Sequence, residues 1–427
     1  MDETFEVGPE YARSRDEADP LASVYDRFYQ PADEQYMDGN SLGPLSVDAE
    51  AAVEAVLAEW RDLAIRGWEA ADPDWFHYGE RLGDRMAPLL GAAPAECVVT
   101  GATTVNIHTL IGSFLDETGG DTVLANELDF PTDHYAIRAQ LRHRDIDPDS
   151  GLRTVESHDG RTIEVDAVAK AIEDHEPDIV FMPSVLYRSG QLLDIERIVE
   201  AAHAHGAVAG FDLAHSVGVV PHALAEHDVD FAVWCSYKYL NGGPGAVGGL
   251  YVAEEHFDVR PALTGWWGHE KASQFDMQPR FTPAEDAGAW QISTPPVLAM
   301  APLDGALDIV HEVGIEAIRA KSLAMTAYLI FLIDEFLDGQ GYTVGTPRDS
   351  ERRGGHVAVE HEEAYRISQA LRDHGVTVDY RPPNVIRVCP TPLATRYMDI
   401  WAVAETLKTV VETEAFTEYE SASSGVT

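Results

Sequence analysis

Short apolar runs alternate with amphipathic stretches through the middle of the chain. Runs typical of buried strands occupy residues 97–99, 122–124, 179–182, 207–211, 230–235 and 249–252. Small or polar residues follow most of these runs, and helical patterns of apolar positions come after several of them. Such alternation favours a mostly parallel sheet with helices on its faces and right-handed crossovers. We therefore expect an α/β fold whose binding site lies at the carboxyl ends of the strands.

The pattern changes in the last third of the chain. Apolar positions predict one long helix over residues 302–337, and the rest then predicts a strand at 356–360, a helix at 362–374, strands within 376–388 and a closing helix at about 397–412. Near the other end, Ser46 and Asp48 are placed to cap a helix. We expect three parts, namely an arm and helix at 1–59 that pack with the small domain, a large domain at 60–301 and a small domain at 302–427.

The charge of the chain excludes some classes of partner. Its 30 basic and 73 acidic residues give a formal net charge of −43, and only five of the bases are lysines. Such a surface repels phosphate backbones and anionic lipids, so we expect no nucleic-acid or membrane partner. Because 45% of the residues are hydrophobic and the acids are dispersed, the pattern indicates a folded protein with an acidic surface.

Cysteine and histidine usage predicts neither a disulfide framework nor a metal site. Cys97, Cys235 and Cys389 are few and far apart, which suits a reducing compartment. His203 and His205 lie two positions apart on an expected helix and so face different ways. With no long apolar run and no leader-like N-terminus, we expect a cytoplasmic protein.

Polar chemistry gathers at the ends of successive expected strands. Asp212 and Lys238 each follow an apolar run, and Lys238 precedes the glycine-rich run 241–245. A desolvated lysine amine forms Schiff bases readily, and a carboxylate can hold a pyridinium nitrogen protonated. The hydroxyl-rich helix start at 103–106 suits a phosphate, and Phe130 could stack on a ring. Together these features indicate a pyridoxal phosphate site.

Longer strings give the chain a resemblance to a known family. They are DGNSLGP at 38–44, GWE at 67–69, ATTVN at 102–106, FPTDHYAIRAQL at 130–141, FDLAHSVG at 211–218, DFAVWCSYKYLNGGPG at 230–245, GWWGHE at 265–270, ISTPP at 292–296 and IRVCPTPL at 386–393. With them the chain resembles the kynureninases, which are fold-type I, aminotransferase class V pyridoxal phosphate enzymes. The resemblance implies a large domain with a mostly parallel seven-stranded sheet and a smaller α+β C-terminal domain. It also implies hydrolysis of L-kynurenine to anthranilate and L-alanine in tryptophan catabolism.

The resemblance also assigns a cofactor site. Lys238 would hold pyridoxal 5'-phosphate as a Schiff base and later remove the substrate Cα proton, and Tyr237 would protonate the β-carbon. Asp212 would pair with the pyridinium nitrogen, with His215 beside the phenolic oxygen. The full expected set of cofactor contacts is Thr103, Thr104, Phe130, Pro131, Thr132, Asp133, Ser184, Asp212, His215, Tyr237, Lys238, Trp266 and Thr294.

Substrate contacts and a partner subunit follow from the same resemblance. Arg387 would bind the substrate carboxylate, and Ser41 would line that pocket. Trp68 and Thr294 stand where members that prefer kynurenine carry Trp and Thr, so we expect kynurenine to be preferred over 3-hydroxykynurenine. Trp266 and Thr294 match positions that the neighbouring subunit supplies, which implies a homodimer with shared active sites.

Two alternatives remain open on sequence grounds. A cysteine desulfurase would share the cofactor site and would need a nucleophilic cysteine in the last third of the chain, where Cys389 lies. A non-catalytic homologue that binds pyridoxal phosphate would keep the fold without the activity.

The acidic surface leads to a prediction about salt. Repulsion among exposed carboxylates is screened to within about 3 Å at 1 M salt, so thermal stability should rise as KCl increases from about 0.1 M to 1 M. Melting followed by circular dichroism tests this, with sucrose of equal osmolality as a control that stabilises without screening charge. A melting temperature that falls over this range would contradict the prediction.

Overall fold

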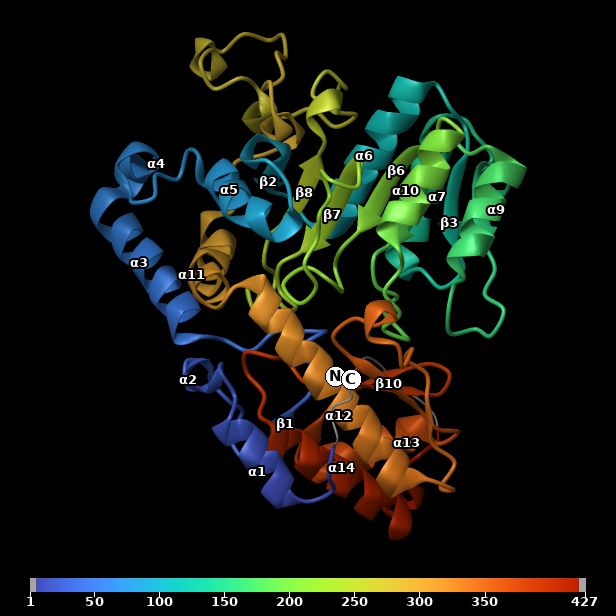
Figure 1. Cartoon of the computed structure of the whole chain (residues 1–427). Coiled ribbons are helices and arrows are strands. Elements are labelled where there is room, and N and C mark those ends of the chain that lie inside the picture. The colour runs from blue at the N-terminus through green and yellow to red at the C-terminus, as the bar shows by residue number, and fades with distance from the viewer. Residues whose placement is uncertain (1–4, 422–427) are drawn as a thin grey trace.

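The computed structural model of the chain describes residues 5–421. It consists of a large lobe, which lies above a small lobe in Figure 1. The large lobe is built on a seven-stranded sheet with the order β2-β8-β7-β6-β5-β3-β4. Its strands are β2 (Cys97–Val99), β3 (Val123–Asn126), β4 (Leu152–Val155), β5 (Ile179–Pro183), β6 (Val208–Asp212), β7 (Phe231–Cys235) and β8 (Gly248–Val252).

The direction of the strands fixes where polar residues meet. Neighbours from β4 to β7 pair in parallel, and β8 pairs antiparallel with both β7 and β2. The expected α/β fold with a mostly parallel sheet is therefore confirmed. Because parallel strands end at the same edge, the residues that follow β5, β6 and β7 come together there.

Helices cover both faces of the large sheet. Apolar side chains of α6 and α7 form one buried cluster with the strands, and those of α5, α9, α10 and α11 form another. In α10, for example, Ile198 and Ala202 are buried while Arg197 is exposed, as the helical spacing of its apolar positions requires. The helices are α3 (Val47–Leu63), α4 (Gly67–Ala70), α5 (Tyr78–Leu90), α6 (Thr103–Thr118), α7 (Pro131–His143), α8 (Pro148–Gly151), α9 (Val165–His175), α10 (Ile195–Ala204) and α11 (Val297–Val313).

The small lobe has its own antiparallel sheet and its own core. The sheet order is β12-β13-β10-β9, and the buried cluster draws on this sheet, on three helices and on Ala12 and Met37 from the N-terminal segment. Strand β1 (Gln35–Tyr36) pairs in parallel with β11 (Val376–Thr377). The remaining elements are α1 (Pro9–Glu17), α2 (Ala22–Tyr25), α12 (Ile315–Leu337), β9 (Thr343–Val344), β10 (Val357–Glu360), α13 (Ala364–Asp373), β12 (Asp379–Arg381), β13 (Val385–Val388) and α14 (Tyr397–Glu412). The division at residues 59 and 301 stays a prediction.

The prediction of one helix over residues 302–337 is wrong, whereas the predicted cap at Ser46 is confirmed. The segment 302–337 is part of two helices, because α11 ends at Val313 and α12 begins at Ile315. Gly314 lies between them with φ at +82°, a conformation that glycine adopts readily and that ends a helix. At the other end of the chain, the Ser46 side chain accepts a hydrogen bond from the Ala49 N–H, as expected of the cap of α3.

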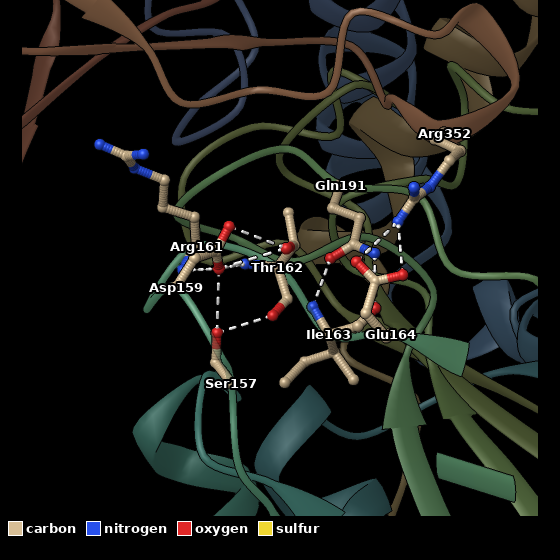
Figure 2. A network of polar contacts seen from close by, with 8 residues as sticks. All are labelled: Ser157, Asp159, Arg161, Thr162, Ile163, Glu164, Gln191 and Arg352. Carbon is tan, nitrogen blue, oxygen red and sulfur yellow. Dashed lines mark hydrogen bonds and ion pairs between the residues drawn. The ribbon is translucent and has the colours of Figure 1, made fainter. Parts of the chain in front are cut away.

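A loop after β4 connects the two lobes, and Figure 2 shows how it is held. Asp159 Oδ1 accepts hydrogen bonds from the backbone N–H groups of Arg161 and Thr162, both at 2.8 Å. From this turn, Arg161 Nη2 reaches Glu360 Oε2 of β10 at 2.6 Å. Arg352 Nη2 lies 3.3 Å from each carboxylate oxygen of Glu164. Two ion pairs that start from this loop thus link the lobes.

No helix among residues 5–421 is long and apolar enough to span a membrane.

Asp230 stabilises the side of the large sheet that lies opposite the carboxyl ends of its parallel strands. Its carboxylate accepts hydrogen bonds from His256 Nε2 at 2.5 Å, from the Ala209 N–H at 2.6 Å and from His203 Nε2 at 2.9 Å. Burial raises the pKa of Asp230, but these hydrogen bonds outweigh burial and hold the pKa below its usual value. The carboxylate therefore stabilises the fold in its charged form.

Asp230→Asn should lower the free energy of unfolding at neutral pH by about 2 kcal/mol, because a buried charge-assisted network loses its acceptor. The folded-state pKa lies below the unfolded one, so this stability is present above about pH 4 and is lost as the pH falls through the folded pKa. Urea denaturation at several pH values tests this, with the exposed Asp228→Asn as the matched control. An equal loss in both variants would contradict the role of Asp230.

Candidate active site

The carboxyl ends of β6 and β7 place an amine beside an imidazole. Lys238 follows β7, and its Nζ lies 2.8 Å from Nε2 of His215, which follows β6. Burial lowers the pKa of Lys238 and, together with the nearby Lys238 and Arg387, lowers the pKa of His215 well below its usual value. Burial thus disfavours the charged form of both groups, and the neutral form is the one in which a lysine is nucleophilic.

Two buried carboxyl groups lie near this amine. Burial raises the pKa of Asp212 to about 6 and the pKa of Asp133 well above its usual range. Within the described residues, Asp133 Oδ1 and His215 Nδ1 have no hydrogen-bond partner. Buried polar atoms are rarely left without partners, so this cluster of side chains is suited to a ligand that carries both polar and charged groups.

Two helix starts lie side by side in the candidate site. Helices α6 and α7 begin at Thr103 and Pro131, and the Oγ1 atoms of Thr104 and Thr132 lie 2.9 Å apart. The free N–H groups and the dipole of a helix start favour an anion, and two starts joined by hydroxyl groups suit a phosphate. Phe130 caps α7 and is 43% exposed, so it is accessible to a ligand.

The loop 38–44 packs closely on the lysine segment. The Gly43 N–H donates a hydrogen bond to the Tyr237 carbonyl at 2.7 Å. A Cβ at Gly43 would meet the Lys238 carbonyl at 2.3 Å, so only glycine allows this approach. The loop thereby carries Ser41 into the site, where its Oγ accepts a hydrogen bond from Arg387 Nη2 at 2.9 Å.

Comparisons with known proteins agree with this geometry. A family model described as "Kynureninase C-terminal domain" matches residues 318–407, and one described as "Cys/Met metabolism PLP-dependent enzyme" matches residues 79–267. The kynureninase of Geobacillus thermodenitrificans is 46% identical over 413 residues, which is 96% of this chain and 96% of that protein. The kynureninase of Bacillus anthracis is 46% identical over 420 residues, or 98% of each chain.

The chain belongs to the kynureninase family. It is therefore a pyridoxal phosphate-dependent hydrolase, as the sequence predicted. Solved structures support the fold. A cysteine desulfurase from Thermococcus onnurineus NA1 has a TM-score of 0.78 at 17% identity, covering 92% of this chain and 98% of that one. A cysteine desulfurase from Escherichia coli has a TM-score of 0.76 at 17% identity with the same coverage.

The side chains fit the cofactor of the kynureninase family. The unpartnered Asp133 and His215 atoms, the buried Asp212 and the paired helix starts offer partners for a ring nitrogen, a ring oxygen and a phosphate. Two residues of the expected set are engaged elsewhere in the protein. Ser184 Oγ lies 2.6 Å from Ser216 Oγ and donates to the Asp212 carbonyl, and Thr103 Oγ1 donates to the Trp234 carbonyl at 3.3 Å.

Three residues expected to contact the cofactor or the substrate make no contact with Lys238 among the described residues. Trp68, Trp266 and Thr294 have no hydrogen bond or ring contact with Lys238 in the described part of the chain. Trp68 lies on α4, at the outer edge of the large lobe in Figure 1, and its ring is 5.4 Å from that of Trp267. Trp266 is 46% exposed and Thr294 is exposed, so both are available to a neighbouring molecule.

Three residues of the site were missed by sequence reasoning. The Tyr187 ring meets Phe130 edge-on at 5.3 Å, and Asp379 accepts a hydrogen bond from Arg387 Nε at 2.6 Å. His356 is fully buried with its ring 5.9 Å from that of His215, and burial lowers its pKa to about 3. Only Asp379 carried a signal, because an acid and a base in neighbouring strands can be cross-strand partners.

Proposed function

We propose that the chain cleaves L-kynurenine with water to anthranilate and L-alanine and prefers kynurenine to 3-hydroxykynurenine. The observation that carries the reaction is the partly buried Lys238 amine 2.8 Å from His215, in a chain 46% identical to a kynureninase over nearly its whole length. The preference rests on Trp68 and Thr294, neither of which offers an imidazole or amide to bind the extra hydroxyl group.

Each cofactor contact has a proposed role. Lys238 would hold pyridoxal phosphate covalently, Asp212 would face its ring nitrogen, and Phe130 would stack on the ring. Thr104 and Thr132, at the two helix starts, would bind the phosphate. When bound, the cofactor supplies an electron sink that allows bonds at the substrate α-carbon to break.

Proton transfers fall to two neighbouring side chains. The lowered pKa of Lys238 favours a neutral amine, which can take the proton from the substrate Cα. Burial raises the pKa of Tyr237, so its hydroxyl group stays protonated and can donate to the substrate β-carbon. The Lys238 Nζ lies 5.8 Å from the centre of the Tyr237 ring, so both groups can reach one substrate.

A second subunit would complete the site. The surface around Trp266 exposes apolar side chains, with Phe275 65% and Met277 71% exposed. Such a surface suits burial against another copy of the chain. We propose a homodimer in which Trp266 and Thr294 reach the partner's cofactor and substrate.

Cysteine desulfurase activity is not favoured. Cys389 is fully buried, and burial raises its pKa to about 12, so the thiolate that would attack sulfur is not formed near neutral pH. Its Sγ lies 3.5 Å from the Tyr239 hydroxyl, inside a closed cluster of apolar side chains.

Lys238→Ala should remove both the covalent link to the cofactor and the base. Anthranilate release from L-kynurenine should fall by about 10³-fold or more, and the absorbance of bound cofactor should vanish after dialysis. Lys170→Ala is the control, since Lys170 is exposed and pairs with Asp174. Retained activity in Lys238→Ala would end the assignment of Lys238.

Trp68→His combined with Thr294→Asn should shift specificity. The introduced groups can hydrogen-bond the extra hydroxyl, so the ratio of kcat/KM for 3-hydroxykynurenine to that for kynurenine should rise by about tenfold or more. Wild-type protein should turn over kynurenine the faster. Trp60→His, on the exposed side of α3, is the control. An unchanged ratio in the double variant would contradict the role of the pair.

A further inference from the structure

The guanidinium group of Arg387 is fully engaged inside the chain. It is 1% exposed, and a guanidinium has five N–H donors. Nε donates to Asp379 Oδ2 at 2.6 Å, Nη2 meets the same oxygen and donates to Ser41 Oγ at 2.9 Å, and Nη1 donates to the Tyr187 carbonyl at 2.8 Å. With the Asn40 side-chain amide turned so that its oxygen faces the guanidinium group, this oxygen lies 3.3 Å from both Nη1 and Nε. A substrate carboxylate can therefore bind Arg387 only by replacing one of these partners.

The two edges of the guanidinium group hold different kinds of partner. The side edge, formed by Nε and Nη2, faces the charged carboxylate of Asp379. The end edge, formed by Nη1 and Nη2, faces two neutral oxygens, the Tyr187 carbonyl and Ser41 Oγ. A carboxylate binds such an edge with two parallel hydrogen bonds. The neutral oxygens thus occupy the positions that the two oxygens of a carboxylate would take.

Asp379 is built into the sheet as the fixed partner. Asp379 of β12 lies directly across the sheet from Arg387 of β13, and it is only 2% exposed. It also pairs with Arg381 Nε at 2.8 Å, so a second cation offsets its charge. Exchanging Asp379 would leave a buried carboxylate short of a partner, which costs more than releasing a neutral oxygen.

The exchangeable partners come from outside the small sheet. Tyr187 follows β5 in the large lobe, and Ser41 belongs to the loop 38–44. Ser41 has a second partner, because its hydroxyl group is also hydrogen-bonded to Asp38. Ser41 Oγ and the Tyr187 carbonyl can therefore move away from Nη1 and Nη2 without breaking the ion pair of Asp379 and Arg387.

We propose that Asp379 is a positioning residue for substrate recognition, which fixes the side edge of Arg387 so that the substrate α-carboxylate takes the end edge from Ser41 and the Tyr187 carbonyl. This inference rests on the proposed role of Arg387 as the carboxylate-binding residue. Asp379 itself touches neither substrate nor cofactor and acts through Arg387.

A double-mutant cycle on the holoenzyme tests the inference. Asp379→Asn, Arg387→Gln and the double variant are titrated with two amines, and the change in cofactor absorbance gives each Kd. L-Alanine carries the carboxylate, whereas the decarboxylated analogue of kynurenine lacks it. Asp379→Asn should raise the Kd for L-alanine by about tenfold or more, because a neutral amide oxygen holds Nε and Nη2 less strongly than a carboxylate oxygen and the arginine can turn away.

The two probes separate positioning from general damage. The Kd for the decarboxylated analogue should change by less than about twofold in Asp379→Asn, and the double variant should bind L-alanine no more weakly than Arg387→Gln. The inference would be overturned if Asp379→Asn weakened the binding of L-alanine and of the decarboxylated analogue equally. It would also be overturned if the fold-changes in the L-alanine Kd from the two single substitutions multiplied in the double variant. An unchanged L-alanine Kd in Arg387→Gln would instead overturn the proposed role of Arg387.

Two further variants keep the test decisive. If Asp379→Asn does not fold, Asp379→Glu retains the charge but shifts the carboxylate, and the same selective loss for L-alanine is expected. Arg381→Gln removes the other ion pair of Asp379 and leaves the Arg387 pair, so its L-alanine Kd should rise by less than about threefold. If the Kd for L-alanine rises as much in Arg381→Gln as in Asp379→Asn, losing either of these ion pairs of Asp379 is enough to weaken binding. This result would overturn the specific role of Asp379 in positioning Arg387.

Discussion

Burial of ionisable side chains at one edge of a parallel sheet is the constraint on which the site depends. Lys238, His215, Asp212 and Asp133 lie where burial disfavours the charged form of each. An isolated buried charge costs several kcal/mol, so the fold carries an electrostatic penalty at this edge. A ligand with a cationic ring nitrogen, an anionic ring oxygen and a phosphate relieves this penalty, and that relief contributes to the affinity of the site for one cofactor.

Salt acts differently on the surface and on the site. The net charge of −43 is carried mainly by exposed carboxylates, whose repulsion salt screens. Exposed ion pairs between the lobes weaken under the same conditions, as expected for Arg352 and Glu164, whose side chains are 46% and 59% exposed. The pair of Asp379 and Arg387 is buried and little screened. Salt that screens the acidic surface therefore has little effect on the pair of Asp379 and Arg387.

Sequence reasoning succeeded where a short stretch of chain decides the structure. Asp212 and Lys238 could be placed at one sheet edge because parallel strands that follow one another end together. The break at Gly314 was missed because apolar positions continue across it, and a single glycine is compatible with either outcome. The pairing of Asp379 with Arg387 depends on the register of a hairpin, which their separation along the chain does not fix.

The hydrogen-bond partners of Arg387 explain how a buried guanidinium group can be stable in the fold and still be able to bind a carboxylate. A buried guanidinium group without partners would destabilise the fold by several kcal/mol. A guanidinium group paired only with carboxylates would hold these partners too strongly to exchange them for a substrate. The chain meets both demands by giving one edge to Asp379 and the other to neutral oxygens. Exchange of neutral for charged acceptors strengthens the hydrogen bonds, while the arginine, already fixed, loses little entropy on binding. Because the Tyr187 carbonyl comes from the large lobe, a carboxylate that took its place on Arg387 would also remove a contact between the two lobes.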